Sequence, residues 1–353
     1  MQKPKKLLLI GGSKGNVHLL NFHRLIASYF EEILVVSNQQ MDQADVQVLN
    51  FELKNPFGML KNVRKLKSII RDFEPDVIHV HQANAYGLIS SLANQGKKPL
   101  VLTTWGSDVL TLPKRSILHR WMVQYVLKSA VEITADAQFM ADAIQGLIGP
   151  TPVVIANFGV EIAPMEQRTS REKVIYSNRM HEPLYRIDEI ILQVTPFLLA
   201  HPDWKLRIAA SGSETERLKQ LAEEHLPASS VEFVGFQSAQ ENRANYLSST
   251  VYVSIPNTDG TSISLLEAMA YGCLPIVSDL PANREWIDNG VNGIISAGNL
   301  SQELTQILEM DHVGIQEKNA LIIESKATKK ANKQKFEAIY DRIFSCEAFT
   351  ANT

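Results

Sequence analysis

Residues 254–286 read SIPNTDGTSISLLEAMAYGCLPIVSDLPANREW, and this stretch decides the fold. It opens with an apolar run, continues through a polar loop that contains glycine, and enters an amphipathic segment that ends at Gly272. A second apolar run and a second polar loop follow. The order predicts strand, loop, helix and strand, which is typical of α/β proteins with a parallel sheet.

Two carboxylates, Asp259 and Glu267, bracket the loop and the first turns of this helix. Gly260, Thr261 and Ser262 stand between them, where the helix is expected to begin. A helix start offers unpaired N–H groups and the positive end of the helix dipole, and it therefore favours phosphate. Since carboxylates repel phosphate, we expect them to bind hydroxyls, and the combination suits a sugar nucleotide. Taken alone, Glu267 also fits the simpler role of complementing the dipole.

Composition describes an ordinary globular chain of two domains. The 353 residues are 45% hydrophobic and 21% charged, which excludes a disordered or fibrous class. No stretch has the roughly 18 apolar residues of a membrane span. Residues 1–165 carry 17 Lys and Arg against 13 Asp and Glu, whereas the remainder carries 18 against 25. This asymmetry is too mild for a nucleic-acid-binding protein, and a cytoplasmic location is expected.

Short apolar runs alternate with helical spacing along the whole chain. Residues 157–170 lack either period and contain Gly159 and Pro164, so a hinge is expected there. We therefore predict two successive doubly wound halves with ligands bound between them, beyond the carboxyl ends of the strands. The expected divisions are residues 1–162, residues 163–330 and a C-terminal helix over 331–353 that returns to the first domain. One long polar helix is predicted over about 313–345.

Glycines follow the first predicted strand in the order G-G-S-K-G, at Gly11, Gly12 and Gly15. Their spacing differs from the dinucleotide fingerprint G-x-G-x-x-G, and no acidic residue ends the next strand. The loop predicts either a close backbone approach to a ligand phosphate or a tight turn.

Five motifs in order resemble the retaining GT-B glycosyltransferases of family 4, glycosyl transferases group 1. Residues 259–277 (DGTSISLLEAMAYGCLPIV) are similar to the family pattern E-G-F-G-x-x-x-x-E-A-M-A-x-G-x-P-V-V. The others are NFGV at 157–160, SNR at 177–179, VEFVGF at 231–236 and GVNGII at 290–295. The resemblance implies a GT-B fold, with two Rossmann-like domains facing each other across a cleft.

The resemblance also implies roles for individual residues. Arg179 holds the donor diphosphate, and Arg186 is the nearest basic candidate for the family's second cation. Asp259 binds hydroxyls of the donor sugar, and Glu267 binds those of the ribose. The remaining donor-binding residues implied are Gly12, Gly15, Gly260, Thr261, Ser262 and Ile263.

The segment TTWGSD at 103–108 departs from the family's T-x-H-G-x-D, because Trp105 replaces the histidine. Trp105 is expected to pack against a sugar face or serve the fold, and Asp108 to take a polar, catalytic role. His81 and His18 are expected on the acceptor side of the cleft. A second departure is Asp259, which is shorter than the family's glutamate by one methylene.

The expected reaction is hexosyl transfer with retention from a nucleotide-diphosphate sugar to a glycan or lipid-linked acceptor, in surface polysaccharide or glycoconjugate biosynthesis. No metal and no cofactor are expected, because Arg179, Arg186 and helix N-termini can stabilise the leaving diphosphate. If the enzyme inverts, Asp108 or His81 is the candidate base. The alternatives are a sugar-nucleotide 2-epimerase of the same fold and a non-catalytic sugar-nucleotide binder.

A basic helix over residues 57–73 and the segment KRSILHRW at 114–121 face either solvent or anionic lipid headgroups. The second alternative predicts peripheral contact with the inner face of the cytoplasmic membrane.

Overall fold

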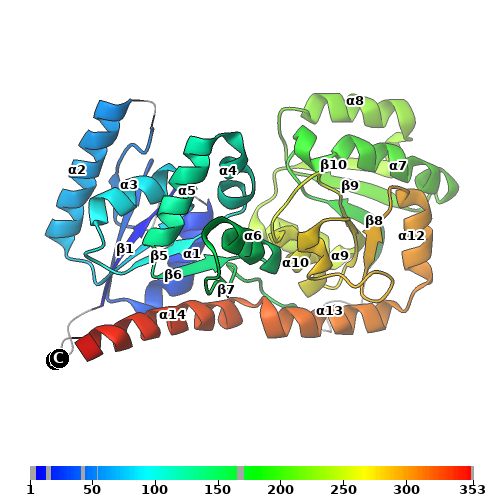
Figure 1. The fold of residues 1–353 in the computed structure, drawn as a ribbon. Coiled ribbons are helices and arrows are strands. Elements are labelled where there is room, and N and C mark those ends of the chain that lie inside the picture. Colours follow the sequence, from blue (N-terminus) through cyan, green and yellow to red (C-terminus); the bar gives the residue numbers. More distant parts are fainter. Residues whose placement is uncertain (1–4, 13–16, 41–43, 54, 165–170, 351–353) are drawn as a thin grey trace. The chain divides into compact units, whose positions relative to one another are not determined.

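The computed structural model describes residues 5–12, 17–40, 44–53, 55–164 and 171–350. The chain forms two compact units (Figure 1): unit 1 extends to Phe158 and resumes at Asn332, and unit 2 comprises Gly159–Ala331. Each unit is built on a parallel sheet, so the prediction of two successive α/β halves is confirmed.

Unit 1 contains a seven-stranded sheet in the order β3-β2-β1-β4-β5-β6-β7. Its strands are β1 (Lys6–Ile10), β2 (Glu32–Ser37), β3 (Val46–Val48), β4 (Val77–His81), β5 (Leu100–Thr103), β6 (Glu132–Ala135) and β7 (Val154–Ile155). Its helices before the hinge are α1 (Val17–Ile26), α2 (Pro56–Phe73), α3 (Ala85–Asn94), α4 (Leu112–Arg115), α5 (Ile117–Ser129) and α6 (Gln138–Ile148). The order reverses between β1 and β4, where open α/β sheets bind ligands beyond the strand ends.

Unit 2 contains a six-stranded sheet in the order β10-β9-β8-β11-β12-β13. Its strands are β8 (Glu172–Ser177), β9 (Lys205–Ala209), β10 (Val231–Gly235), β11 (Ser249–Ser254), β12 (Leu274–Ser278) and β13 (Ile294–Ser296). Its helices are α7 (Ile187–Ala200), α8 (Thr215–His225), α9 (Ala239–Ser248), α10 (Ile263–Ala270), α11 (Pro281–Arg284), α12 (Leu300–Glu309) and α13 (His312–Lys326). Here the order reverses between β8 and β11.

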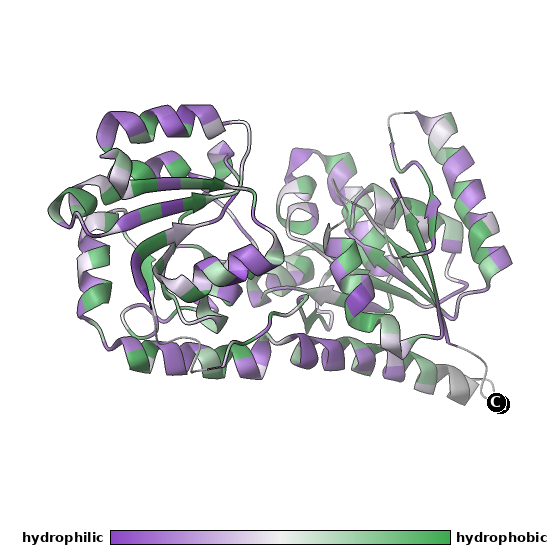
Figure 2. Cartoon of the chain, turned by 180° about the vertical axis from the view of Figure 1, so that it is seen from behind, coloured by the Kyte–Doolittle hydropathy of each residue, from purple (hydrophilic) through white to green (hydrophobic). Residues whose placement is uncertain are grey.

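Burial on both faces explains the apolar strands. In β1 the side chains of Leu7 and Leu9 lie on one face and those of Leu8 and Ile10 on the other, in separate core clusters. The central strands are accordingly coloured mainly as apolar, whereas the helices alternate (Figure 2). A strand covered by helices on both sides needs no polar face, so the period-two alternation disappears.

The prediction of one helix over about 313–345 is wrong. The chain forms α13 and then α14 (Lys329–Thr350), separated at Ala327 and Thr328. At this break the Val160 N–H donates to the Ala327 carbonyl at 2.8 Å, and the Lys329 N–H donates to the Val160 carbonyl at 3.2 Å. The hinge segment after β7 thus pairs with the break, and these backbone bonds replace helical ones.

α14 packs on unit 1. Phe336, Ile339 and Tyr340 are fully or almost fully buried and belong to the same core cluster as Leu7 and Phe22. Asn332, also fully buried, accepts a hydrogen bond from the Asn157 N–H at 2.9 Å. The two segments that join the units, one before β8 and one after α13, therefore run beside each other.

Candidate functional site

The strand reversal in unit 2 brings together two loops that are 80 residues apart in sequence. Arg179 lies two residues after β8, and Asp259 lies in the loop after β11. The Asn257 N–H donates to the Leu184 carbonyl at 2.9 Å, which joins the two loops. The carboxyl ends of the two central strands therefore present both residues at one edge of the sheet.

Arg179 is the centre of a compact polar cluster. Its Nη2 lies 2.8 Å from Asp259 Oδ2, and its Nη1 donates to Ser262 Oγ. Its guanidinium also lies over the ring of Tyr185, 4.5 Å from the ring centroid. Only 11% of the Arg179 side chain is exposed, so this cation is held in a fixed position and largely out of water.

The Asp259 carboxylate is largely buried, with 21% of its side chain exposed. Burial raises its pKa, and the Arg179 guanidinium and the Gly260 N–H, which donates to Oδ1 at 3.0 Å, oppose that rise. The cation and the amide thus offset part of the cost of burying this carboxylate. The structure thus brings Arg179 and Asp259, both predicted site residues, into direct contact.

Helix α10 begins next to this ion pair. Ser262 is its N-cap and accepts from the Leu265 N–H at 3.4 Å, and Thr261 Oγ1 accepts from Trp286 Nε1 at 3.4 Å. Ile263 is the first residue of the helix, and its N–H has no acceptor within the helix by geometry. The expected helix start at residues 260–262 is therefore confirmed to within a residue, and an anion beside Arg179 would meet its positive end.

Glu267, one turn further along α10, lies against buried tyrosines. Burial raises its pKa, and a hydrogen bond from Tyr246 opposes the rise. Tyr246 in turn accepts from Asn178 Nδ2 at 2.7 Å, and Tyr252 donates to Asn178 Oδ1 at 3.3 Å. Since Asn178 immediately precedes Arg179, one network fixes the positions of both Glu267 and the cation. The sequence did not predict this network.

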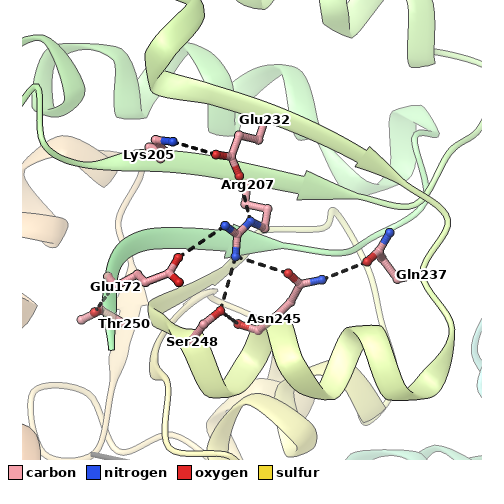
Figure 3. A network of polar contacts seen from close by, with 8 residues as sticks. All are labelled: Glu172, Lys205, Arg207, Glu232, Gln237, Asn245, Ser248 and Thr250. Carbon is pink, nitrogen blue, oxygen red and sulfur yellow. Dashed lines mark hydrogen bonds and ion pairs between the residues drawn. The ribbon is translucent and has the colours of Figure 1, made fainter. Parts of the chain in front are cut away.

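Helix α9 carries Tyr246, and a second network, drawn in Figure 3, holds that helix on the sheet. Arg207 on β9 donates to Glu232 at 3.0 Å, to Asn245 at 3.3 Å and to Ser248 at 3.4 Å. Lys205 donates to Glu232 from the same strand, at 2.9 Å. Charged groups that hold α9 on the sheet therefore support the site without belonging to it.

Within the described part of the chain, Arg186 makes no hydrogen bond or ion pair with the Arg179 cluster. Its guanidinium forms an ion pair with Glu189, three residues later on α7. Its backbone has a φ of +54°, in the left-handed region, at the start of α7. The neighbouring Tyr185, which sequence reasoning did not select, contacts Arg179 instead.

In unit 1, Gly12 is the second residue after β1, at the strand reversal. A Cβ there would lie 2.3 Å from Asn38 Oδ1 and 2.6 Å from the Tyr86 hydroxyl. A larger residue at this position would require these side chains to move. Gly15 lies outside the described residues.

An aromatic cluster lies beside Gly11, where an added Cβ would be 3.0 Å from the Cβ of His81. Trp105 Nε1 donates to His81 Nδ1 at 3.1 Å, and the His18 ring stacks on Phe158 with centroids 5.7 Å apart. His18 and Trp105 meet edge to face at 5.2 Å. The structure therefore brings together the three residues predicted for the acceptor side. The His81 Nε2 atom is buried without a hydrogen-bond partner in the part of the chain that the structure describes.

Asp108 is 2% exposed, and both of its oxygens accept from backbone. Oδ2 accepts from the Ala83 N–H at 2.7 Å, and Oδ1 accepts from the Trp105 N–H at 3.0 Å. Burial raises its pKa and these amides oppose the rise. The carboxylate thus ties the loop after β4 to the loop after β5, in a π-helical turn (Ser107–Thr111) that the sequence did not predict.

Asp108→Asn should lower the free energy of unfolding by about 1–3 kcal/mol, because an amide nitrogen would face one of the two N–H donors. Urea unfolding at neutral pH measures this. Asp142→Asn on the exposed face of α6 is the control and should change stability by less than about 0.5 kcal/mol. Equal stability of the two variants would contradict the role given to Asp108.

Two buried histidines of β4 are expected to lower the stability of unit 1 in acid. Burial lowers the pKa of His81 to about 3 and that of His79 well below its usual value, and His79 bonds the Tyr340 hydroxyl and Thr103 Oγ1. Both are neutral when folded but protonate near pH 6.5 when unfolded. The free energy of unfolding should therefore fall below about pH 6.5, by up to about 1.4 kcal/mol per pH unit for each histidine.

Urea unfolding followed at roughly pH 7 and pH 5 tests this expectation. His81→Gln should fold with a shallower dependence on pH, since one titrating group is removed. The same slope in the wild type and in His81→Gln would contradict it.

Among the described residues, no group of three or more His, Cys, Asp or Glu could hold a metal ion. None of the helices that the structure describes is long and apolar enough to cross a membrane.

Both units match family models of glycosyl transferases. The family model described as glycosyl transferase 4-like matches residues 6–137, and the model described as glycosyl transferases group 1 matches residues 161–329. An uncharacterized glycosyltransferase of Haemophilus influenzae is 23% identical over 324 residues, 86% of this chain and 88% of that protein. The phosphatidyl-myo-inositol mannosyltransferase of Mycolicibacterium smegmatis is 29% identical over 265 residues, 71% of this chain and 66% of that protein.

Solved structures show the same fold. The Anabaena protein HepE in complex with UDP is similar with a TM-score of 0.80 at 16% identity, covering 96% of this chain and 100% of that one. A lipopolysaccharide outer core galactosyltransferase is similar with a TM-score of 0.72 at 17% identity, covering 96% and 99%.

Proposed function

The chain is a glycosyltransferase with the GT-B fold, and from this premise we propose that unit 2 binds a nucleoside diphosphate hexose at the β8–β11 strand reversal. The observation that carries the proposal is the buried Arg179, fixed by Asp259, Ser262 and Tyr185 beside the start of α10. A fixed cation next to a helix N-terminus is a site for the donor diphosphate.

The proposed step breaks the bond between the anomeric carbon and the β-phosphate oxygen, and negative charge develops on the diphosphate. Arg179 and the first amides of α10 are already oriented toward such a charge, so little reorganisation is needed as it forms. The acceptor hydroxyl attacks the face that the nucleotide leaves, and the departing phosphate takes its proton. The sugar is thereby transferred with retention and without a separate base.

Glu267 is proposed to accept hydrogen bonds from the ribose hydroxyls, in the orientation that Tyr246 gives it. Asp259 is proposed to accept a hydrogen bond from a hydroxyl of the donor sugar through Oδ1. Its Oδ2 keeps Arg179 in place. Gly12 is proposed to leave room for a donor phosphate close to the backbone of its loop. Arg186 is proposed as the second cation for the diphosphate, a role that requires its guanidinium to leave Glu189.

The acceptor is proposed to contact the cluster of Trp105, His81 and His18 in unit 1. A flat indole suits the apolar face of a sugar ring. Asp108 acts as a positioning residue there, because both of its oxygens hold the loop that carries Trp105. We propose a glycan or lipid-linked acceptor and a place at the inner face of the cytoplasmic membrane, reached through anionic headgroups.

A thermal-shift panel with UDP-, GDP-, CMP- and dTDP-sugars tests donor binding, since a ligand of the folded state raises its stability by mass action. The selected donor should then release nucleoside diphosphate only when an acceptor is added. Release or epimerised product from the donor alone would favour a 2-epimerase. Binding without turnover in the presence of glycan and lipid-linked acceptors would favour a non-catalytic binder.

A further inference from the structure

Helix α5 in unit 1 exposes large apolar side chains on the side opposite to its core contacts. The exposed fractions are 72% for Ile117, 77% for Leu118, 73% for Trp121 and 45% for Tyr125. At 3.6 residues per turn these four positions span roughly 100° of the helix circumference. We call these four residues the apolar face of α5.

The opposite side of α5 carries the residues that pack the helix onto unit 1. Val123, Val126 and Leu127 are buried in the core of unit 1, and Val126 lies so close to Gly87 of α3 that a Cβ there would be 2.5 Å from it. The apolar face is therefore not needed to hold α5 on the sheet. Single exposed apolar residues are ordinary, but four on one helix side mark an interaction surface.

The apolar face borders a groove between α3 and α5. The groove has a volume of about 560 Å³ and is lined by Leu88, Leu92, Leu118, Trp121, Met122, Gln124, Tyr125 and Lys128. Its walls are mostly hydrocarbon, and one cation stands at its edge. Such a groove is complementary to a lipid, whose acyl chain is apolar and whose headgroup is charged.

Basic residues surround the apolar face without any acidic neighbour in sequence. Lys114, Arg115, Arg120 and Lys128 are exposed, and no Asp or Glu occurs between Asp108 and Glu132. On the far side of α3, which contacts both α2 and α5 (Figure 1), a pocket of about 400 Å³ collects further bases. It is lined by Arg64, Lys67, Arg71, Lys97 and Lys98 with Glu74 and four uncharged residues.

We propose that the apolar face of α5 inserts into the headgroup region of an anionic bilayer, while the surrounding bases bind lipid phosphates. The charge complementarity favours a membrane over a second copy of the chain, whose matching face would be equally basic. Trp and Tyr prefer the interface between lipid and water, and long basic side chains reach from it to the headgroups. The inference rests on the membrane contact proposed above and adds the segment that inserts.

Vesicle co-sedimentation of the full chain tests the inference, using phosphatidylcholine vesicles with about 30 mol% phosphatidylglycerol. The test variant is Leu118→Ser with Trp121→Ser. The matched control is Leu199→Ser with Leu321→Ser, which removes side chains that are 59% and 66% exposed in unit 2. The test variant should lose at least about tenfold in vesicle affinity, and the control should bind as the wild type does.

Salt and fluorescence separate insertion from charge attraction alone. At about 0.5 M NaCl the screening length is about 4 Å, so binding by charge alone disappears, whereas inserted apolar side chains retain part of it. Brominated lipid should quench Trp121 emission in the wild type, and the loss of quenching in Trp121→Ser assigns it to that residue.

Three outcomes decide the matter. If Leu118→Ser with Trp121→Ser binds vesicles like the wild type and only Lys61→Gln with Arg64→Gln weakens binding, the membrane contact stands and the insertion of α5 is wrong. If neither the wild type nor any variant binds vesicles, and sedimentation shows a wild-type dimer that Trp121→Ser converts to a monomer, the apolar face of α5 binds a second copy of the chain. That result overturns the inference. If the wild type binds no vesicles and stays monomeric, both the contact and the insertion are wrong. Donor binding is unaffected by each outcome, which separates this inference from the sugar-transfer proposal.

Discussion

Arg179→Ala should reduce kcat for sugar transfer by about 10²–10³-fold, because a fixed cation aimed at the departing diphosphate is lost. The effect should appear in kcat more than in KM, since the charge on the leaving group grows toward the transition state. Steady-state rates of nucleoside diphosphate release, with acceptor saturating, measure this split.

Loss of catalysis must be distinguished from loss of stability, because Arg179→Ala also leaves the Asp259 carboxylate without its cation. The double variant Arg179→Ala with Asp259→Asn removes that uncompensated charge and should regain stability in urea unfolding. It should remain as slow as the single variant in transfer. Recovery of the rate together with stability would show that Arg179 acts only on the fold.

Glu267→Ala should weaken the binding of the matching nucleoside diphosphate by about 30- to 150-fold, or roughly 2–3 kcal/mol, because two ribose hydroxyls lose a charged acceptor. Isothermal calorimetry with the free nucleotide measures the change without turnover. Tyr246→Phe should give a smaller loss of the same sign, because the carboxylate remains but loses the hydrogen bond that orients it.

Glu216→Ala on α8 is the matched control for this experiment, since its side chain is 81% exposed and belongs to the same unit. It should bind the nucleotide with unchanged affinity. An unchanged affinity of Glu267→Ala would remove the assignment of the nucleotide to α10.

The two α/β halves could be predicted from the sequence because a strand buried on both faces produces a short continuous apolar run. The break between α13 and α14 could not. Residues 326–329 read KATK and contain neither Gly nor Pro, and the helix ends because Val160 takes the Ala327 carbonyl. A contact across more than 160 residues leaves no local signal.

In the site, too, some features could be predicted from the sequence and others could not. The loop from Asp259 to Ser262 was predictable, because a glycine-containing polar loop before a helix is a local pattern. The support for Arg179 and Glu267 was not, because Asn178, Tyr246 and Tyr252 come from separate elements and only the fold aligns their polar atoms. Tyr185 was within reach of sequence reasoning, since it adjoins Arg186, but its contact with Arg179 depends on how the loop turns.

The return of α14 to unit 1 has a consequence for the order in which the protein matures. Residues 159–331 of unit 2 are continuous, so this unit has all of its core as soon as they have left the ribosome. Unit 1 begins synthesis first, yet Phe336, Ile339 and Tyr340 complete its core only after unit 2 has been made. The half synthesised first is thus finished last, and until then the apolar surface that α14 covers is open to chaperones.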